Sequence, residues 1–199
     1  ASTGGLEVWD RQLAAYGSTV IARRAEFVRF LETASANIYA TLTDGAEQFA
    51  VSYKANVDPG EGSGESEIAE RFLRALAEKR DLDLSRATTH TGPHRDDLNL
   101  TVNGLAAREF ASQGQQRTAA IALKLAEIDL MEQTTGEPPV VLLDDIMAEL
   151  DESRRQRIFE STVGRCQTIV TTTHVAEIGQ AVLERSAVFE VRSGTVTRL

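Results

Sequence analysis

Four apolar residues followed directly by two carboxylates constrain this chain more than any other feature. The stretch Val140–Leu143 contains no polar residue and runs straight into Asp144 and Asp145. An uninterrupted apolar strand is typical of a parallel sheet whose two faces are both buried. Ligands of open α/β sheets bind beyond the carboxyl ends of the strands. One carboxylate there can hold Mg²⁺ on nucleotide phosphates, directly or through water, and the next can orient or deprotonate an attacking water. The alternative is a strand that ends in a polar turn, and the pair of acids alone does not decide between the two.

Helices and strands alternate around this strand. A helical pattern precedes it from about Gln115 to Gln133, with Ile121, Leu125 and Ile128 on one face. After it we expect a helix at about 152–164, a strand at 168–172, a helix at about 175–184, and strands at 187–191 and 195–199. Such alternation predicts α/β architecture.

The first forty residues carry an apolar stripe at helical spacing. The stripe comprises Trp9, Leu13, Tyr16, Val20, Phe27, Leu31, Ala34, Ile38 and Leu42. Its heptad-like spacing fits a coiled-coil-type arm, and an ordinary long core helix fits it equally well. A second helix, from about Ser66 to Arg80, is the candidate partner of the first, through Ile68, Phe72 and Leu76. Between the second helix and the helical pattern that starts at about Gln115, the pair Asn103-Gly104 is a strong signal for a β-hairpin.

The bulk properties are those of an ordinary globular chain. Hydrophobic residues make up 42% and charged residues 26%, and no apolar run approaches the ~20 residues of a membrane span. The net charge of −9 argues against a generic nucleic-acid binder, so contacts with DNA would come from a local patch, a partner chain or a missing segment. The single cysteine, Cys166, excludes an internal disulfide framework and fits a reducing cytoplasm.

Three further motifs accompany the two carboxylates in a particular order. Ser112-Gln-Gly-Gln-Gln-Arg117 opens a helix, Ala148-Glu-Leu-Asp151 follows the carboxylates, and Thr171-Thr-Thr-His174 follows a strand. A hydroxyl, a glycine and a helix N-terminus together form an anion site. Taken singly, Ser112 and Asp151 are also good helix caps, and His174 could be a structural histidine. Taken in order, the motifs resemble the ABC ATPase family from its signature motif onward.

The resemblance implies that some of these residues act across a dimer interface. Ser112, Gly114 and Gln115 would form the signature that closes on the γ-phosphate of ATP held by the opposite subunit. Asp151 resembles the D-loop aspartate, which works across the same interface.

The resemblance assigns the other residues to the nucleotide of their own subunit. Asp144 looks like the Mg²⁺ ligand, and His174 matches the switch histidine that reaches the γ-phosphate. Asp145 falls where ABC proteins usually carry a catalytic glutamate. An aspartate is one methylene shorter than that glutamate, and the resemblance assigns it the same role of positioning water.

A second signature narrows the family. The segment Thr91-Gly-Pro-His-Arg-Asp-Asp-Leu98 resembles the Gly-Pro-His segment of the RecF family of DNA replication, repair and recombination ATPases. The resemblance covers the whole chain, by pattern in the helical part and by motif from about Thr91. It implies an ATP- and Mg²⁺-dependent homodimer that clamps DNA at single-strand gaps or junctions. It also implies action with RecO and RecR to load RecA, as part of the SOS-related response to DNA damage.

The resemblance also predicts how the chain is divided. Residues 1–86 would form a helical arm with a short strand region, and 87–199 the C-terminal part of the ATPase lobe. A P-loop needs Gly-x-x-x-x-Gly-Lys-Ser/Thr, and no lysine of this chain follows a glycine. We therefore expect a chain that begins at or within the helical lobe and neither binds ATP tightly nor hydrolyses it alone. The alternatives are a fragment of another SMC-type head, a transporter ATPase, or a non-catalytic DNA-repair binding module that keeps the motifs as scaffold.

Overall fold

The computed structural model describes residues 5–144, 151–175 and 178–199. These residues group into two compact units. The first unit contains residues up to 36 together with 48–111, and the second contains 37–47 together with 112–199. One long helix, α1 (Leu6–Leu42), begins in the first unit and ends in the second.

In the first unit, α1 packs against α2 (Glu65–Arg86). The core between them is made of Ala14, Ile21, Val57, Ile68, Phe72 and Leu76. The predicted partnership of the two helices is therefore confirmed, although α2 continues six residues beyond the predicted end at Arg80. A helix ends where its backbone can turn away, and here Ala87 takes a left-handed conformation with φ of 49°.

The buried side of α1 differs from the predicted stripe. Leu31 and Leu42 are buried as expected, but Trp9 and Tyr16 are 67% and 77% exposed. The contact side instead includes Gly17, where a Cβ atom would lie 2.3 Å from the ring of Phe72. Small residues let the two helices approach closely, and this close approach leaves the bulky aromatics of the stripe outside. The stripe prediction is therefore wrong at Trp9, Tyr16 and Val20, whereas Leu13 packs against the core as predicted.

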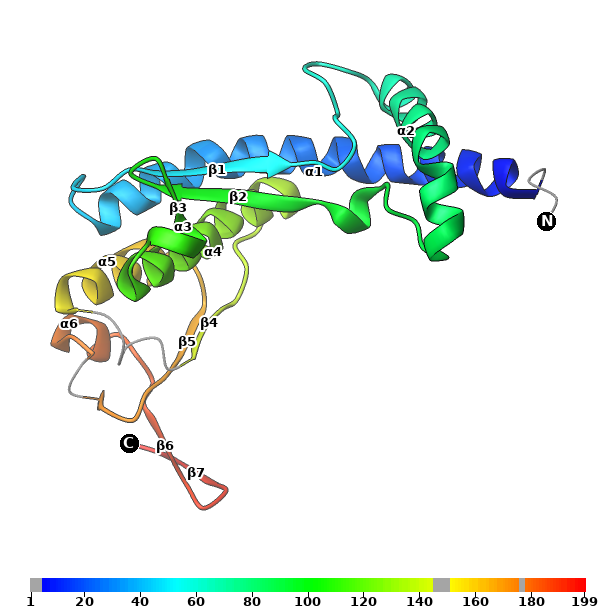
Figure 1. The fold of residues 1–199 in the computed structure, drawn as a ribbon. Coiled ribbons are helices and arrows are strands. Elements are labelled where there is room, and N and C mark those ends of the chain that lie inside the picture. Colours follow the sequence, from blue (N-terminus) through cyan, green and yellow to red (C-terminus); the bar gives the residue numbers. More distant parts are fainter. Residues whose placement is uncertain (1–4, 145–150, 176–177) are drawn as a thin grey trace. The chain divides into compact units, whose positions relative to one another are not determined.

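The same unit holds an antiparallel sheet of β1 (Phe49–Lys54), β2 (Asp97–Val102) and β3 (Leu105–Ala106). β1 and β2 pair along their whole length, from Phe49 opposite Val102 to Lys54 opposite Asp97 (Figure 1). The turn between β2 and β3 uses Asn103 and Gly104, both with positive φ, as the hairpin signal predicts. A short helix, α3 (Ala107–Phe110), follows.

The Gly-Pro-His segment folds into a 3-10 turn, η2 (Pro93–Arg95), that ends at Asp96. The Asp96 carboxylate accepts hydrogen bonds from Arg24 at 2.9 Å, from the Tyr53 hydroxyl at 2.5 Å, and from the Asn56 backbone N–H at 2.8 Å. Its side chain is only 3% exposed. This segment therefore ties α1, β1 and the loop after β1 together through one buried carboxylate.

The second unit contains α4 (Gln113–Thr135), β4 (Val141–Asp144), α5 (Glu152–Thr162), β5 (Thr168–Thr171), α6 (Gln180–Leu183), β6 (Phe189–Arg192) and β7 (Thr195–Arg198). β4 and β5 are parallel, with Asp144 opposite Thr171, and β6 and β7 form an antiparallel hairpin. The α/β prediction is therefore confirmed. The helix expected at about 175–184 is shorter than predicted, since α6 covers four residues.

One expectation about β4 is wrong. Leu143 is buried at 8% exposure, and it lines a cavity of about 310 Å³ together with Ile128 of α4 and Ile158 of α5. Leu142 is 69% exposed. Successive strand residues point to opposite faces of a sheet, so within the described residues β4 is buried on one face and open on the other.

Candidate nucleotide site

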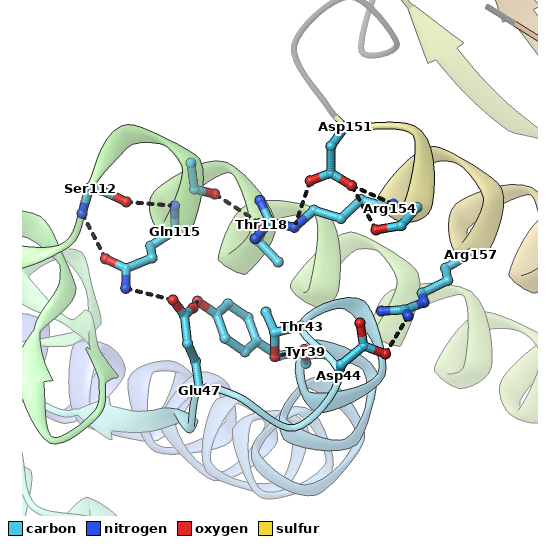
Figure 2. Close-up of polar contacts among 12 residues, drawn as sticks. Tyr39, Thr43, Asp44, Glu47, Ser112, Gln115, Thr118, Asp151, Arg154 and Arg157 are labelled. Atoms are coloured by element: carbon cyan, nitrogen blue, oxygen red, sulfur yellow. Dashed lines mark hydrogen bonds and ion pairs between the residues drawn. The ribbon is translucent and has the colours of Figure 1, made fainter.

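The signature segment forms the N-terminus of α4. Ser112 is the N-cap, with extended φ and ψ of −61° and 160°. Its Oγ accepts a hydrogen bond from the Gln115 backbone N–H at 3.2 Å, and the Gln115 Oε1 accepts one from the Ser112 N–H at 2.8 Å. This reciprocal capping box satisfies two backbone donors and holds the first turn of a 23-residue helix (Figure 2). The capping alternative for Ser112 is therefore confirmed, and it leaves the hydroxyl proton available to another acceptor.

Asp151 forms the N-cap of α5. Its Oδ1 accepts from the Arg154 backbone N–H at 2.9 Å and from the Ser153 hydroxyl at 2.7 Å. These hydrogen bonds, the backbone one first, hold the pKa of Asp151 below its usual value. The capping alternative is therefore confirmed for Asp151 as well.

Arg154 brings the two capped helices into contact. Its Nε lies 3.4 Å from the Asp151 Oδ2, and a Cβ atom placed on Gly114 would be 3.8 Å from its Nη1. Figure 2 shows this side chain reaching from α5 toward the start of α4. The structure thus brings the signature segment and Asp151 to one place, with a guanidinium between them. Arg154 is not among the site residues predicted from sequence, because no local pattern distinguishes it from its neighbours Arg155 and Arg157.

Glu47, in the turn after α1, contacts the signature segment, and Tyr39 in the last turns of α1 contacts Glu47. The Gln115 Nε2 donates to the Glu47 Oε1 at 2.8 Å, and the Tyr39 hydroxyl donates to the Glu47 Oε2 at 2.6 Å (Figure 2). The Tyr39 side chain is fully buried. Neither residue is among the site residues predicted from sequence, because Glu47 and Gln115 are 68 positions apart and no motif connects them.

The predicted metal ligand lies elsewhere in the second unit. Asp144 ends β4 with an exposed side chain, and its Oδ1 accepts from the Thr171 hydroxyl at 2.5 Å. His174 follows β5 three residues later, with its Nδ1 2.9 Å from the Thr173 hydroxyl. The parallel pairing of β4 and β5 therefore brings Asp144 and the start of the His174 segment to the same end of the sheet. Asp145 lies outside the described residues.

The chemistry of Asp144 fits Mg²⁺ that arrives with a nucleotide. Mg²⁺ in nucleotide sites takes one or two carboxylates and fills its other positions with phosphate oxygens and water. Across the described ranges, no three His, Cys, Asp or Glu side chains gather as ligands for a metal ion. In the same ranges, no helix is long and apolar enough to span a bilayer.

Comparison with known proteins shows which class of protein this fold belongs to. Two solved structures, described as the recombination mediator protein RecF with ATP and with ATPrS in the RecFOR pathway, each superpose with a TM-score of 0.84. Their sequences are 33% and 32% identical to this chain, which is covered completely and spans 51% and 52% of theirs. No protein-family model matches. The fold is that of the C-terminal half of an ABC-type ATPase head.

Curated relatives agree with the structures. The DNA replication and repair protein RecF of Synechococcus sp. (strain JA-3-3Ab) is 39% identical over 189 residues, 94% of this chain and 50% of that protein. The RecF protein of Acetivibrio thermocellus is 45% identical over 168 residues, 84% of this chain and 45% of that protein. The chain belongs to the RecF family, and it spans about half the length of the curated relatives it matches.

Proposed function

We propose that this chain supplies the signature, Walker B, D-loop and switch residues of a RecF-type ATPase whose complete form dimerises around ATP. The ATP-closed dimer would hold DNA at single-strand gaps or junctions, act with RecO and RecR to load RecA, and open on hydrolysis. The observation that carries the proposal is the capped N-terminus of α4, with Arg154 beside Gly114. We place this activity in the cytoplasm, where a lone buried thiol stays reduced.

The start of α4 has the chemistry of a phosphate site. The N–H groups of the first turn and the helix dipole both favour an anion at a helix N-terminus. Gly114 has no side chain to keep a phosphate away, and the Ser112 hydroxyl can donate to it. The guanidinium of Arg154 adds a fixed positive charge next to the same turn. These groups would bind the γ-phosphate of ATP held by the opposite subunit.

The site residues form two groups, and each group is proposed to act on the nucleotide of a different subunit of the dimer. Ser112, Gly114 and Asp151 lie with Arg154, and they are the residues proposed to act on the partner's nucleotide. Asp144 and His174 follow neighbouring strands and are proposed to act on the nucleotide of their own subunit.

The second group has its own chemistry. Asp144 would hold Mg²⁺, which neutralises phosphate charge, and Asp145 would orient the attacking water. A neutral His174 that accepts at Nδ1 carries its proton on Nε2, where it can donate to a phosphate oxygen.

The proposal is tested by ATP-dependent dimerisation. Light scattering would be measured on the complete RecF-type protein in which this chain forms one half, with and without ATP and Mg²⁺. We expect a dimer that forms only with both and is lost in Ser112→Arg, because the new side chain fills the phosphate position. Ser85→Arg, which adds the same side chain at an exposed site on α2, is the control and should dimerise normally. Equal dimerisation of Ser112→Arg and the wild type would refute the proposal.

The isolated chain provides a second test. We expect it to show no ATP turnover and only weak DNA binding, since its net charge is −9. Turnover by the purified chain that disappears in Asp144→Ala would contradict the first expectation. Tight binding of DNA that weakens steeply with salt would contradict the second.

A further inference from the structure

A chain of hydrogen bonds connects the end of α1 to the signature segment. It runs from the buried Tyr39 hydroxyl to the Glu47 carboxylate, then to the Gln115 side-chain amide, and from there to the Ser112 backbone (Figure 2). The three distances are 2.6, 2.8 and 2.8 Å. All four residues belong to the second compact unit.

The direction of each hydrogen bond follows from the chemistry of Glu47. The hydrogen bond from Tyr39 is the largest influence holding the pKa of Glu47 below its usual value, so the carboxyl is ionised at neutral pH. Burial raises the pKa of Tyr39, which therefore stays protonated and donates. An ionised carboxylate only accepts hydrogen bonds, so Gln115 must turn its NH₂ group toward Glu47. Its carbonyl oxygen then faces the Ser112 N–H, as the capping box requires.

The turn that carries Glu47 is also held from the other side. The Arg157 guanidinium of α5 donates to the Thr41 carbonyl oxygen at 2.7 Å and forms an ion pair with Asp44. Just after α1, the Thr43 hydroxyl donates to the Tyr39 carbonyl oxygen at 2.9 Å. The segment 39–47 is thereby anchored to both helices whose N-termini carry the proposed trans-acting residues.

We propose that Tyr39 and Glu47 are positioning residues of the signature motif. They fix the side-chain amide of Gln115, and through it the capping box of Ser112, in the orientation that meets the partner's nucleotide. This inference rests on the proposed ATP-dependent dimer. Because the signature acts on nucleotide held by the other subunit, loss of Tyr39 or Glu47 weakens dimer closure and leaves ATP binding by a single subunit unchanged.

The experiment compares two affinities in the complete protein. The dissociation constant of the ATP–Mg²⁺ dimer would be measured by sedimentation, and ATP affinity by titration at a concentration where the protein is monomeric. We expect Tyr39→Phe and Glu47→Ala to raise the dimer dissociation constant about tenfold, the effect of losing one charge-assisted hydrogen bond. ATP affinity of the monomer should stay within about twofold, well below the tenfold step of a lost hydrogen bond.

Two further variants distinguish a positioning role of Tyr39 and Glu47 from a general destabilisation of the segment 39–47. Glu47→Gln should be milder than Glu47→Ala, because the amide oxygen still accepts from Gln115 and the amide NH₂ can donate to the Tyr39 hydroxyl. Asp44→Asn removes the ion pair of the same turn without touching α4, and it should dimerise like the wild type. The inference is wrong if Asp44→Asn weakens the dimer as much as Glu47→Ala, or if monomer ATP affinity falls equally.

Ser112→Arg distinguishes failure of this inference from failure of the proposed function. If Ser112→Arg abolishes the dimer and Glu47→Ala leaves it intact, only the positioning role is refuted. If neither variant affects dimerisation, both the positioning role and the ATP-clamped dimer are refuted.

Discussion

Replacing Gly17 by alanine should affect the stability of the protein in two opposite ways, through helix propensity and through core packing. Gly17 lies inside α1, where glycine costs about 1 kcal/mol relative to alanine, so propensity alone predicts a more stable protein. Packing predicts the opposite. The new Cβ atom would lie 2.3 Å from Cε1, 3.1 Å from Cδ1 and 3.3 Å from Cζ of Phe72, whereas ordinary contacts begin at 3.4 Å.

The structure indicates that packing dominates. The Phe72 ring would have to move by about 1 Å, and it is 0% exposed in a core that it forms with Ala14, Ile21, Ile68 and Leu76, and protein cores are close-packed. Overpacking of a filled core costs about 1–3 kcal/mol, and the middle of that range exceeds the gain in propensity by about 1 kcal/mol. We expect Gly17→Ala to lower the free energy of unfolding by about 1 kcal/mol.

Urea unfolding followed by circular dichroism would measure the change. Gly114→Ala is the matched control, because it also lies in a helix but its new Cβ would meet its nearest neighbour at 3.8 Å. That variant should be unchanged or more stable by up to about 1 kcal/mol. Adding Phe72→Leu to Gly17→Ala should cost less than the sum of the single changes, since the smaller side chain relieves the clash. A Gly17→Ala protein as stable as the wild type would refute the reasoning.

Three further predictions concern individual groups. Asp96→Ala should lower the free energy of unfolding by about 2–4 kcal/mol in urea titrations, because the half-buried Tyr53 hydroxyl and other donors lose their acceptor. Asp97→Ala, which changes an exposed neighbour, is the control and should cost under about 1 kcal/mol. The pKa of Glu47 is lowered in the folded state, so the ionised Glu47 carboxylate stabilises the fold at pH values above its ordinary pKa. This stabilisation is lost as the pH falls through the folded-state pKa. The Glu47→Gln protein should therefore lose less stability than the wild type between about pH 5 and pH 3 in thermal melts, and parallel curves would argue against the assigned hydrogen bonds. Burial raises the pKa of the Cys166 thiol, so reaction with a disulfide reagent at pH 8 should be slow in the folded protein and fast in urea, and equal rates would contradict its burial.

Local features of the site could be predicted from sequence. Ser112 with Gln115 three residues later is a capping-box pattern, and the structure forms both of its hydrogen bonds. Asp144 ends the strand β4 and His174 comes three residues after the strand β5, and both strands are present and parallel. The roles of these residues in ATP binding and hydrolysis stay predictions.

The sequence alone determined where most helices and strands lie, because caps, turns and periodicity depend on residues only a few positions apart. It determined the α/β class for the same reason. It could not determine which side of α1 is buried, because that depends on the close contact of Gly17 with Phe72.

Tertiary structure also decided which side chains surround the signature segment. Glu47 and Arg154 meet it from the turn after α1 and from α5, far away along the chain, and only tertiary packing brings their charges within reach of α4. Contacts of this kind leave no periodicity and no motif in the sequence, because each partner is an ordinary polar residue in its own local context.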